Sequence, residues 1–176
     1  MVRVRAARAG DAAAIAGIHT RSWRATYAAI LGVDTVNRID EAARTALWSR
    51  RIRDLSPGQV VLVAGSDSDV AGFLYGGPSP DGDAVADVAQ VLSVHVDPLR
   101  TGAGLGGALL HRAGSEFAAA GYREATLWVV SDNAGARRFY ERSGWAPDGA
   151  SRHEPLAVEG ESGEAVTVVR YRRPLP

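Results

Sequence analysis

Four glycines, Gly102, Gly104, Gly106 and Gly107, follow directly on the apolar stretch V-L-S-V-H-V-D-P-L-R at positions 91–100. Glycine lets the backbone approach a ligand closely. A helix that begins at such a turn presents unpaired N–H groups and the positive end of its dipole, which together suit an anion such as a phosphate. The pattern fits a phosphate-binding turn and a tight turn with no ligand equally well, because a short glycine motif is a weak signal.

The elements that must position this turn follow from the spacing of the apolar residues. Ala86–Val96 is rich in β-branched side chains and is followed by Pro98, which predicts a strand. Apolar residues recur at helical spacing from Leu105 onward, so we expect a helix over Leu105–Ala120 that ends at Gly121. The glycines thus lie between a strand and a helix.

A second motif, N-A-G-A-R-R-F-Y-E-R-S-G-W at positions 133–145, makes the first one specific. Together they resemble the GNAT superfamily of N-acetyltransferases, whose signature is a strand ending in V-x-P, then [QR]-x-x-G-x-[GA] opening a helix, and later N-x-x-A-x-x-F-Y-x-x-x-G-[FW]. The matching residues are Val96, Pro98, Gly104, Gly106, Asn133, Ala136, Phe139, Tyr140, Gly144 and Trp145. The sequence departs from the signature at the [QR] position, which is Thr101, with Arg100 just before it.

The resemblance implies acetyl-CoA as co-substrate and no metal. Backbone N–H groups of the glycine turn would hold the pyrophosphate, and the strand edge Val94–Val96 would pair with the amides of the pantetheine arm. Arg100 either reaches the phosphates or lies in solvent, and Asn133 either caps the next helix or meets the cofactor. The residues expected to bind acetyl-CoA are Val94, His95, Val96, Thr101, Gly102, Ala103, Gly104, Leu105, Gly106, Gly107, Asn133, Arg137 and Tyr140.

Acetyl transfer to an amine needs a proton acceptor for the amine, a donor for the thioester oxygen and a proton for the departing thiolate. The resemblance assigns the last role to Tyr140, whose alternative is an aromatic core residue, and the backbone N–H of Val94 is the expected oxygen donor. Many family members carry a glutamate base six residues before the valine of V-x-P, but here that residue is Gln90. Glutamine cannot accept the proton, although it can orient the amine or a water. The other candidates for the base are Asp87, Ser93, His95, His19, His153 and a chain of waters.

The acceptor site is less well defined by the sequence. His19, Trp23 and Tyr27 are spaced by four and form one stripe of the expected first helix, where they are either core residues or contacts to the acceptor. Ser22, Trp23 and Tyr27 resemble the pattern of family members with small-molecule acceptors. We therefore expect a small-molecule amine as substrate. The alternatives are a protein or peptide N-acetyltransferase, and a non-catalytic sensor that binds acyl-CoA.

Composition sets further bounds. The 176 residues are 46% hydrophobic and 23% charged with a formal net charge of zero, which favours one globular domain over 1–176 and gives no electrostatic case for nucleic acid or membrane. There is no cysteine, which excludes an acyl-cysteine intermediate and a thiolate metal site. All 20 basic residues are arginine, so lysine Schiff-base chemistry is excluded as well. No signal peptide fits, and we expect a cytoplasmic protein.

The whole chain reads as a mixed α/β fold. We expect strands at Val2–Ala7, Gln59–Gly65, Val70–Gly76, Glu124–Ser131, from Trp145 and at Ala165–Arg172. We expect helices at Ala12–Leu31 (capped by Asp11), Asp40–Leu55 and Ala134–Arg142. A loop is expected at Gly76–Asp83, and irregular chain over Ser151–Gly163. This order agrees with the family plan, a mostly antiparallel sheet with helices on both faces. In that plan two parallel strands, here Ala86–Val96 and Glu124–Ser131, splay apart to admit the cofactor. Trp128, Trp145 and the last strand offer apolar edge surface, so we also expect a homodimer.

Overall fold

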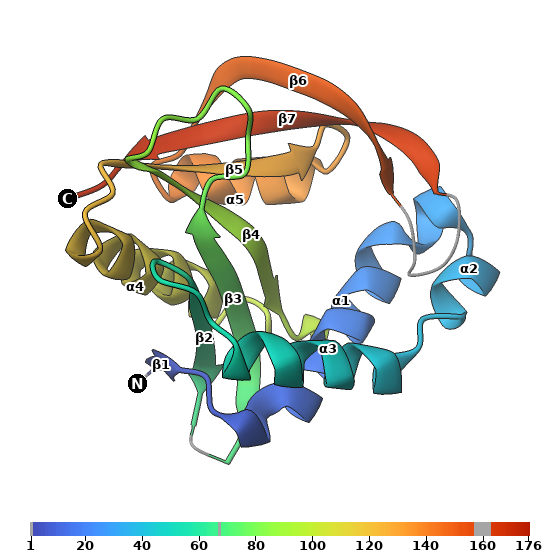
Figure 1. Ribbon diagram of the computed structural model, residues 1–176. Helices are drawn as coiled ribbons and strands as arrows, with labels where there is room; N and C mark the ends of the chain where they lie inside the picture. Colours follow the sequence, from blue (N-terminus) through green and yellow to red (C-terminus); the bar gives the residue numbers. More distant parts are fainter. Residues whose placement is uncertain (1, 67, 157–162) are drawn as a thin grey trace.

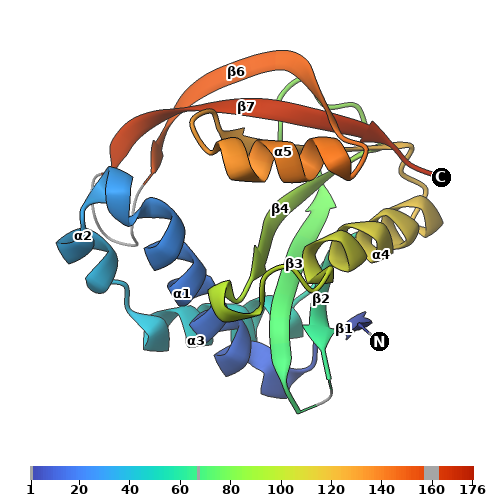
Figure 2. The same cartoon turned by 180° about the vertical axis from the view of Figure 1, so that it is seen from behind.

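A computed structural model describes residues 2–66, 68–156 and 163–176 of the chain. Figures 1 and 2 show its elements from opposite sides. In chain order they are β1 (Arg3–Ala6), α1 (Ala12–Leu31), α2 (Val33–Asn37), α3 (Glu41–Arg53), β2 (Val60–Gly65), β3 (Val70–Pro78), β4 (Val88–Val96), α4 (Leu105–Ala119), β5 (Glu124–Val130), α5 (Ala134–Arg142), β6 (Ala146–Leu156) and β7 (Glu164–Pro174). Short 3₁₀ helices at Ala9–Asp11 and Pro98–Arg100 complete the order.

The strands form one seven-stranded sheet in the order β1-β2-β3-β4-β5-β7-β6. Neighbouring strands are antiparallel except β4 and β5, which are parallel. A parallel pair needs a crossover connection, and α4 with its glycine turn supplies it. The expected mixed α/β fold with a mostly antiparallel sheet is confirmed.

The two parallel strands separate soon after they meet. Their register runs only from Val88 opposite Glu124 to Gln90 opposite Thr126. Beyond this point β4 keeps β3 on one side, while β5 continues beside β7. Figure 1 shows β4 turning down and away from β5. The pairing of β3 with β4 also slips between Tyr75 and Gly76, which leaves Leu92 as the extra residue of a β-bulge and bends β4 further.

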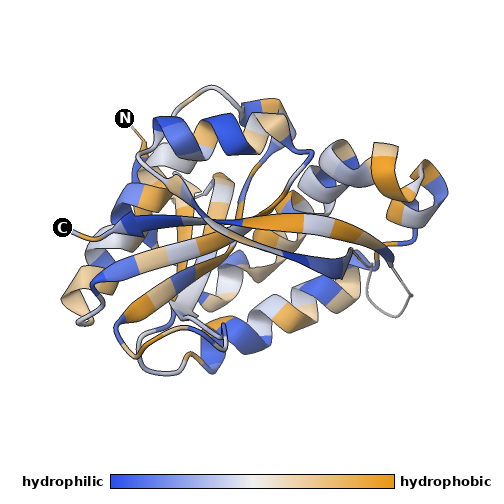
Figure 3. Cartoon of the chain, turned by 90° about the horizontal axis from the view of Figure 1, so that it is seen from above, coloured by the Kyte–Doolittle hydropathy of each residue, from blue (hydrophilic) through white to orange (hydrophobic). Residues whose placement is uncertain are grey.

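Two apolar clusters hold helices against opposite faces of the sheet. In β2, Val61 and Val63 pack with α1, with Trp48 of α3 and with Phe73. Their neighbours Leu62 and Ala64 point the other way, into the cluster that includes α4. Figure 1 shows α3 in front of the sheet, and Figure 2 shows α4 and α5 over the opposite face. In Figure 3 hydrophilic and hydrophobic residues alternate along the helices, as expected of helices that bury one side.

Two expectations about local structure need correction, and one helix was not expected. The segment predicted to be irregular belongs to β6 as far as Leu156, because residues 151–156 pair with β7; residues 157–162 lie outside the described ranges. Asp11 stands at the start of α1 but does not cap it, since its carboxylate accepts from the backbone N–H of Arg8 and from Arg5. The helix expected at Asp40–Leu55 is confirmed as α3, and the short α2 before it was not predicted.

The residues expected to form an apolar dimer contact are less exposed than predicted. Trp145 is buried, with 5% of its surface exposed, in the cluster beneath α4. Trp128 is half-buried and donates its indole N–H to Asp81. Neither tryptophan is therefore an exposed apolar residue. The last strand, β7, is paired with β5 on one side and with β6 on the other, so it is not an edge strand. The homodimer stays a prediction without this basis.

Candidate functional site

A cavity of about 910 Å³ opens where β4 and β5 separate. Its walls come from β4 residues 91–96, β5 residues 127–130, the glycine turn, the first turn of α4, α5 and one side of α1. Fourteen residues expected to bind a ligand or act in catalysis lie in its lining: His19, Trp23, Tyr27, Val94, His95, Val96, Thr101, Gly102, Gly104, Leu105, Gly106, Gly107, Asn133 and Tyr140. The structure thus brings two distant motifs and the α1 stripe to one place.

Three expected site residues lie elsewhere. Ala103 does not contribute to the lining. Arg137 turns away and donates to the hydroxyl of Tyr171 at 3.1 Å and to the carbonyl of Ser131 at 3.1 Å. Gln90 is buried where β4 and β5 still pair, and its amide oxygen accepts from the hydroxyl of Ser79 at 3.0 Å. These contacts place Gln90 and Arg137 among the groups that hold strands and helices together.

The glycine turn has the backbone shape that glycine alone adopts without strain. Gly102 and Gly104 have φ angles of 82° and 76°, and Gly104 is the N-cap of α4. Gly106 serves packing, because a Cβ there would lie 2.9 Å from the ring of Phe139 in α5. Gly107 has open space around a Cβ. The first N–H groups of α4 therefore face the cavity from a short, open turn.

The strand edge opposite this turn is unpaired on its cavity side. Past Gln90, the register of the described strands gives β4 no partner from β5, so the stretch 91–96 borders the cavity with free edge groups. Asp97 fixes the end of this strand by accepting from the N–H of Leu99 and from the guanidinium of Arg21 on α1. The guanidinium is the main cause that lowers the pKa of Asp97. Strand, turn and helix α1 are thereby tied together.

Asn133 and Tyr140 bring α5 to the cavity. The amide oxygen of Asn133 accepts from the N–H of Ala136 at 3.1 Å, so this residue caps α5 and lines the cavity at once. Tyr140 lies three helical positions before Ser143, near the C-terminus of α5, and its ring centre is 6.2 Å from that of Tyr171. Burial, helped by Tyr27, raises the pKa of the Tyr140 phenol. The phenol therefore keeps its proton across the neutral pH range.

Two histidines, His19 and His95, meet at the base of the cavity with ring centres 5.0 Å apart. The hydroxyl of Ser22 is 2.8 Å from Nδ1 of His95, and the indole N–H of Trp48 donates to Nδ1 of His19 at 3.4 Å. Burial lowers the pKa of His95 to about 4 and that of His19 to about 2. The charge of Arg44 also lowers the pKa of His95. The charges of His95, Arg44 and Arg51, in that order, also lower the pKa of His19. Both rings are neutral at pH 7 and are weak proton acceptors.

The other predicted proton acceptors divide between the cavity and the surface. Ser93 lines the cavity, whereas Asp87 and His153 do not. Nδ1 of His153 is 3.2 Å from the hydroxyl of Thr167 on the neighbouring strand. Arg100 reaches the cavity rim but forms an exposed ion pair with Asp69 at 2.8 Å. None of these groups is a buried carboxylate aimed at the cavity.

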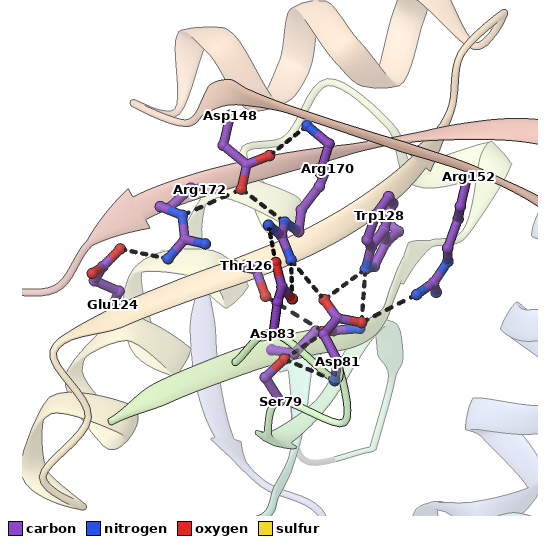
Figure 4. A network of polar contacts seen from close by, with 12 residues as sticks. Ser79, Asp81, Asp83, Glu124, Thr126, Trp128, Asp148, Arg152, Arg170 and Arg172 are labelled. Carbon is purple, nitrogen blue, oxygen red and sulfur yellow. Dashed lines mark hydrogen bonds and ion pairs between the residues drawn. The ribbon is translucent and has the colours of Figure 1, made fainter. Parts of the chain in front are cut away.

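The structure adds lining residues that the sequence did not suggest, above all Leu92, Trp128 and Glu154. The ring of Trp128 is fixed by Asp81, which accepts its indole N–H at 2.9 and 3.1 Å, and Arg152 lies 4.0 Å from the ring centre (Figure 4). Glu154 of β6 receives a hydrogen bond from Nε of Arg152 at 2.9 Å. Nothing in the sequence indicated that Glu154 lies on a strand beside the cavity, because its segment has a polar and irregular pattern.

A buried arginine holds this wall together. Arg170 of β7 donates two hydrogen bonds to Asp83 at 2.8 Å, and also binds Asp148 and Asp81 (Figure 4). These contacts raise its pKa, and they pin the loop between β3 and β4 to β6 and β7. Since Asp81 also holds Trp128, the loop predicted from its glycines and prolines supports one side of the cavity.

The described residues offer neither a metal site nor a membrane-spanning helix. They contain no group of three or more histidine, aspartate or glutamate side chains arranged to hold a metal ion. Within the same ranges, every helix is too short or too polar to cross a membrane.

Comparisons with known proteins agree with this geometry. A family model described as acetyltransferase (GNAT) family matches residues 13–145. A protein of Mycobacterium tuberculosis named a probable N-acetyltransferase is 29% identical over 175 residues, covering 97% of this chain and 92% of its own. An uncharacterized N-acetyltransferase of Bacillus subtilis is 28% identical over 133 residues, which is 76% of this chain and 74% of that protein. Among solved structures, a proposed acetyltransferase of Salmonella typhimurium, determined with its cofactor acetyl-CoA, has a TM-score of 0.71 at 26% identity and covers 99% of this chain and 94% of its own.

Proposed function

Because the chain belongs to the GNAT acetyltransferase family, we propose that it transfers the acetyl group of acetyl-CoA directly to the amine of a small molecule. One observation carries the proposal. The gap between β4 and β5 has an unpaired strand edge along one side and the start of α4 at one end, and both border a single cavity. These are the two features that the amides and the pyrophosphate of acetyl-CoA require.

The residues present fit acetyl-CoA without any charged cluster. Gly102 and Gly104 expose the N–H groups of the turn, because a positive φ turns the backbone and no side chain covers it. Thr101 adds a hydroxyl at the cavity rim, and the edge of Val94–Val96 offers N–H and carbonyl groups. When bound, acetyl-CoA supplies a thioester, which is an activated acyl group. The proton acceptor for the amine, the donor to the thioester oxygen and the proton for the thiolate must come from this chain or from water.

Three groups of the chain act on the reaction in this proposal. A backbone N–H of the bulged β4 segment, for which Val94 is the candidate, donates to the thioester oxygen as negative charge grows there. Tyr140 holds a proton at its Oη for the sulfur that leaves, and its raised pKa keeps that proton in place until then. The side chains of His19, Trp23 and Tyr27 form the wall that orients the acceptor.

The acceptor amine must lose a proton, and no described side chain is a strong base at the reaction centre. His95 and His19 have pKa values of about 4 and 2, far below the value of roughly 10 for a free alkylamine. Gln90 cannot accept a proton and is bonded to Ser79 outside the cavity. We therefore propose that the amine loses its proton to water, so that kcat/KM rises with pH toward the pKa of the free amine.

An assay of CoA release tests the proposal directly. Because the chain has no cysteine, a thiol reagent added to protein, acetyl-CoA and an amine reports the CoA thiol alone. We expect release with at least one class of small amine and acetylated product by mass spectrometry. Turnover only with peptides would assign the protein to peptide acetylation instead. Tight binding of acetyl-CoA with no turnover on any amine or peptide would make it a sensor and contradict the proposal.

A further inference from the structure

Glu154 is the one acidic residue among the described residues that line the cavity. It belongs to β6, opposite Val166 of β7, and its carboxylate is partly exposed. The mechanism proposed above gives it no task. One positive charge, that of Arg152, already meets this carboxylate.

The surroundings of Glu154 suit a cation. Trp23, Tyr27 and Trp128 line the same cavity, and the rings of Trp23 and Tyr27 stand edge to face with centres 4.8 Å apart. Burial and then the negative charge of Glu154 raise the pKa of Tyr27, so this carboxylate lies within electrostatic reach of α1. Aromatic faces attract a positive charge, and a neighbouring carboxylate adds to that attraction.

The chain already places a positive charge here. The guanidinium of Arg152 lies 4.0 Å from the centre of the Trp128 ring, and its Nε donates to Glu154 at 2.9 Å. Both side chains of this ion pair are about 40% exposed, at 44% and 39%, so the pair adds little stability and can exchange partners. Arg152 also bonds Asp81 at 3.1 Å (Figure 4), which leaves it paired when Glu154 turns to a ligand.

We propose that Glu154 binds a second positive charge on the acceptor, one that is separate from the amine being acetylated. This inference rests on the proposed function and names its substrate class, a diamine or an amine that carries a guanidinium. The amine that attacks must be neutral, and a carboxylate beside it would raise its pKa and keep it protonated. Glu154 therefore helps the reaction only when its charge meets a different cationic group of the same molecule.

The test compares two acceptors of equal length, 1,4-diaminobutane and butylamine, in wild type and Glu154→Gln. Glutamine keeps the shape and removes the charge. We expect KM for the diamine to rise at least about tenfold, which is about 1.4 kcal/mol, while kcat, KM for butylamine and the Kd of acetyl-CoA change less than twofold. Glu164→Gln is the matched control, because Glu164 is exposed on β7 and does not line the cavity. Circular dichroism checks that each variant is folded.

Other results would overturn the inference. An equal rise of KM for both amines would mean that the second charge is not recognised. A fall of kcat at constant KM would make Glu154 a base. Calorimetry with the CoA-bound protein separates this inference from the proposed function: the wild type should bind 1,4-diaminobutane at least tenfold more tightly than Glu154→Gln does, even if no amine is acetylated. Equal affinities, or no binding by the wild type, would contradict it.

Discussion

The cavity has two halves that are built in different ways. The half formed by β4 residues 91–96 and the turn Gly102–Gly107 is one continuous stretch of chain that offers backbone groups. The other half gathers side chains from α1, β5 and β6, namely Trp23, Tyr27, Trp128 and Glu154. A site made of backbone groups keeps its ligand when side chains are replaced, as long as the φ angles stay the same. A site made of side chains can bind a different ligand after each substitution. This contrast implies a fixed cofactor and an adaptable acceptor.

Tyr140 lies where the two halves meet, and its replacement should have the largest effect. We expect Tyr140→Phe to lower kcat by roughly 10²–10⁴-fold, the usual value of general acid catalysis, while KM for acetyl-CoA changes little. Steady-state CoA release measures both constants. Tyr171→Phe is the control, since this buried phenol binds Glu141 and Arg137 but does not line the cavity. A normal kcat in folded Tyr140→Phe would leave Tyr140 with a packing role alone.

The backbone half is tested by forcing one φ angle. Valine in place of Gly104, at φ 76°, has open space around its Cβ but costs about 1–2 kcal/mol in this backbone region. We expect the turn to change shape and the Kd of acetyl-CoA to rise at least about tenfold by calorimetry. Gly121→Val carries the same strain at the other end of α4, with φ 95° and equally open space. It should keep the affinity, and equal losses in both variants would show that general destabilisation is the cause.

The side-chain half is tested at the α1 stripe. Trp23→Ala should raise KM for the acceptor about fivefold, because it removes one aromatic wall, worth roughly 1 kcal/mol or more in such contacts. The Kd of acetyl-CoA should stay within twofold of the wild-type value. Trp23→Phe should recover most of the loss, since it restores an aromatic face. If Trp23→Ala weakens acetyl-CoA as much as the acceptor, the division of the cavity into two halves is wrong.

The smallest effect concerns pH. His95 has a pKa lowered to about 4 in the folded protein, against about 6.5 in an unfolded chain. The unfolded state thus binds more protons between these values, so the free energy of unfolding falls as pH drops from 6.5 to 4, by at most about 1.4 kcal/mol per pH unit. Urea titrations at several pH values measure this slope. His95→Asn should flatten it, and an unchanged slope would show that His95 does not resist protonation.

The same contrast decides what the sequence could predict. The turn of the backbone half was predicted from the resemblance and from Val96, Pro98 and Gly104, which are close in sequence. Gly106 also serves a contact with Phe139 of α5, which is distant in sequence. Trp23 and Tyr27 were found from helical spacing and from the resemblance to family members with small-molecule acceptors. Their function could not be settled, because a helix that packs in a core and a helix that lines a cavity show the same spacing of aromatic residues.

Glu154, Gln90 and Arg137 show where prediction from the sequence fails. The strand that carries Glu154 has a polar sequence and forms by pairing with β7, a long-range contact that local propensity does not report. Gln90 stands where many family members carry glutamate, and Arg137 stands at an unspecified position inside the second motif. Their side chains bond Ser79 and Tyr171 instead. Which partner a long polar side chain chooses depends on the packed structure, so spacing cannot reveal it.

The short parallel register between β4 and β5 has a consequence for motion. Among the described residues, the strand register between the two parts of the sheet has three residue pairs, from Val88 with Glu124 to Gln90 with Thr126. Amide hydrogens on the open edge of β4 have no strand to shield them, so they should exchange with deuterium faster than those inside the β5–β7 ladder. A ligand that forms hydrogen bonds with the open edge of β4 should slow this exchange. In this seven-stranded sheet, a ligand held in the gap would therefore tie β4 to β5 over a longer stretch than their own three residue pairs do.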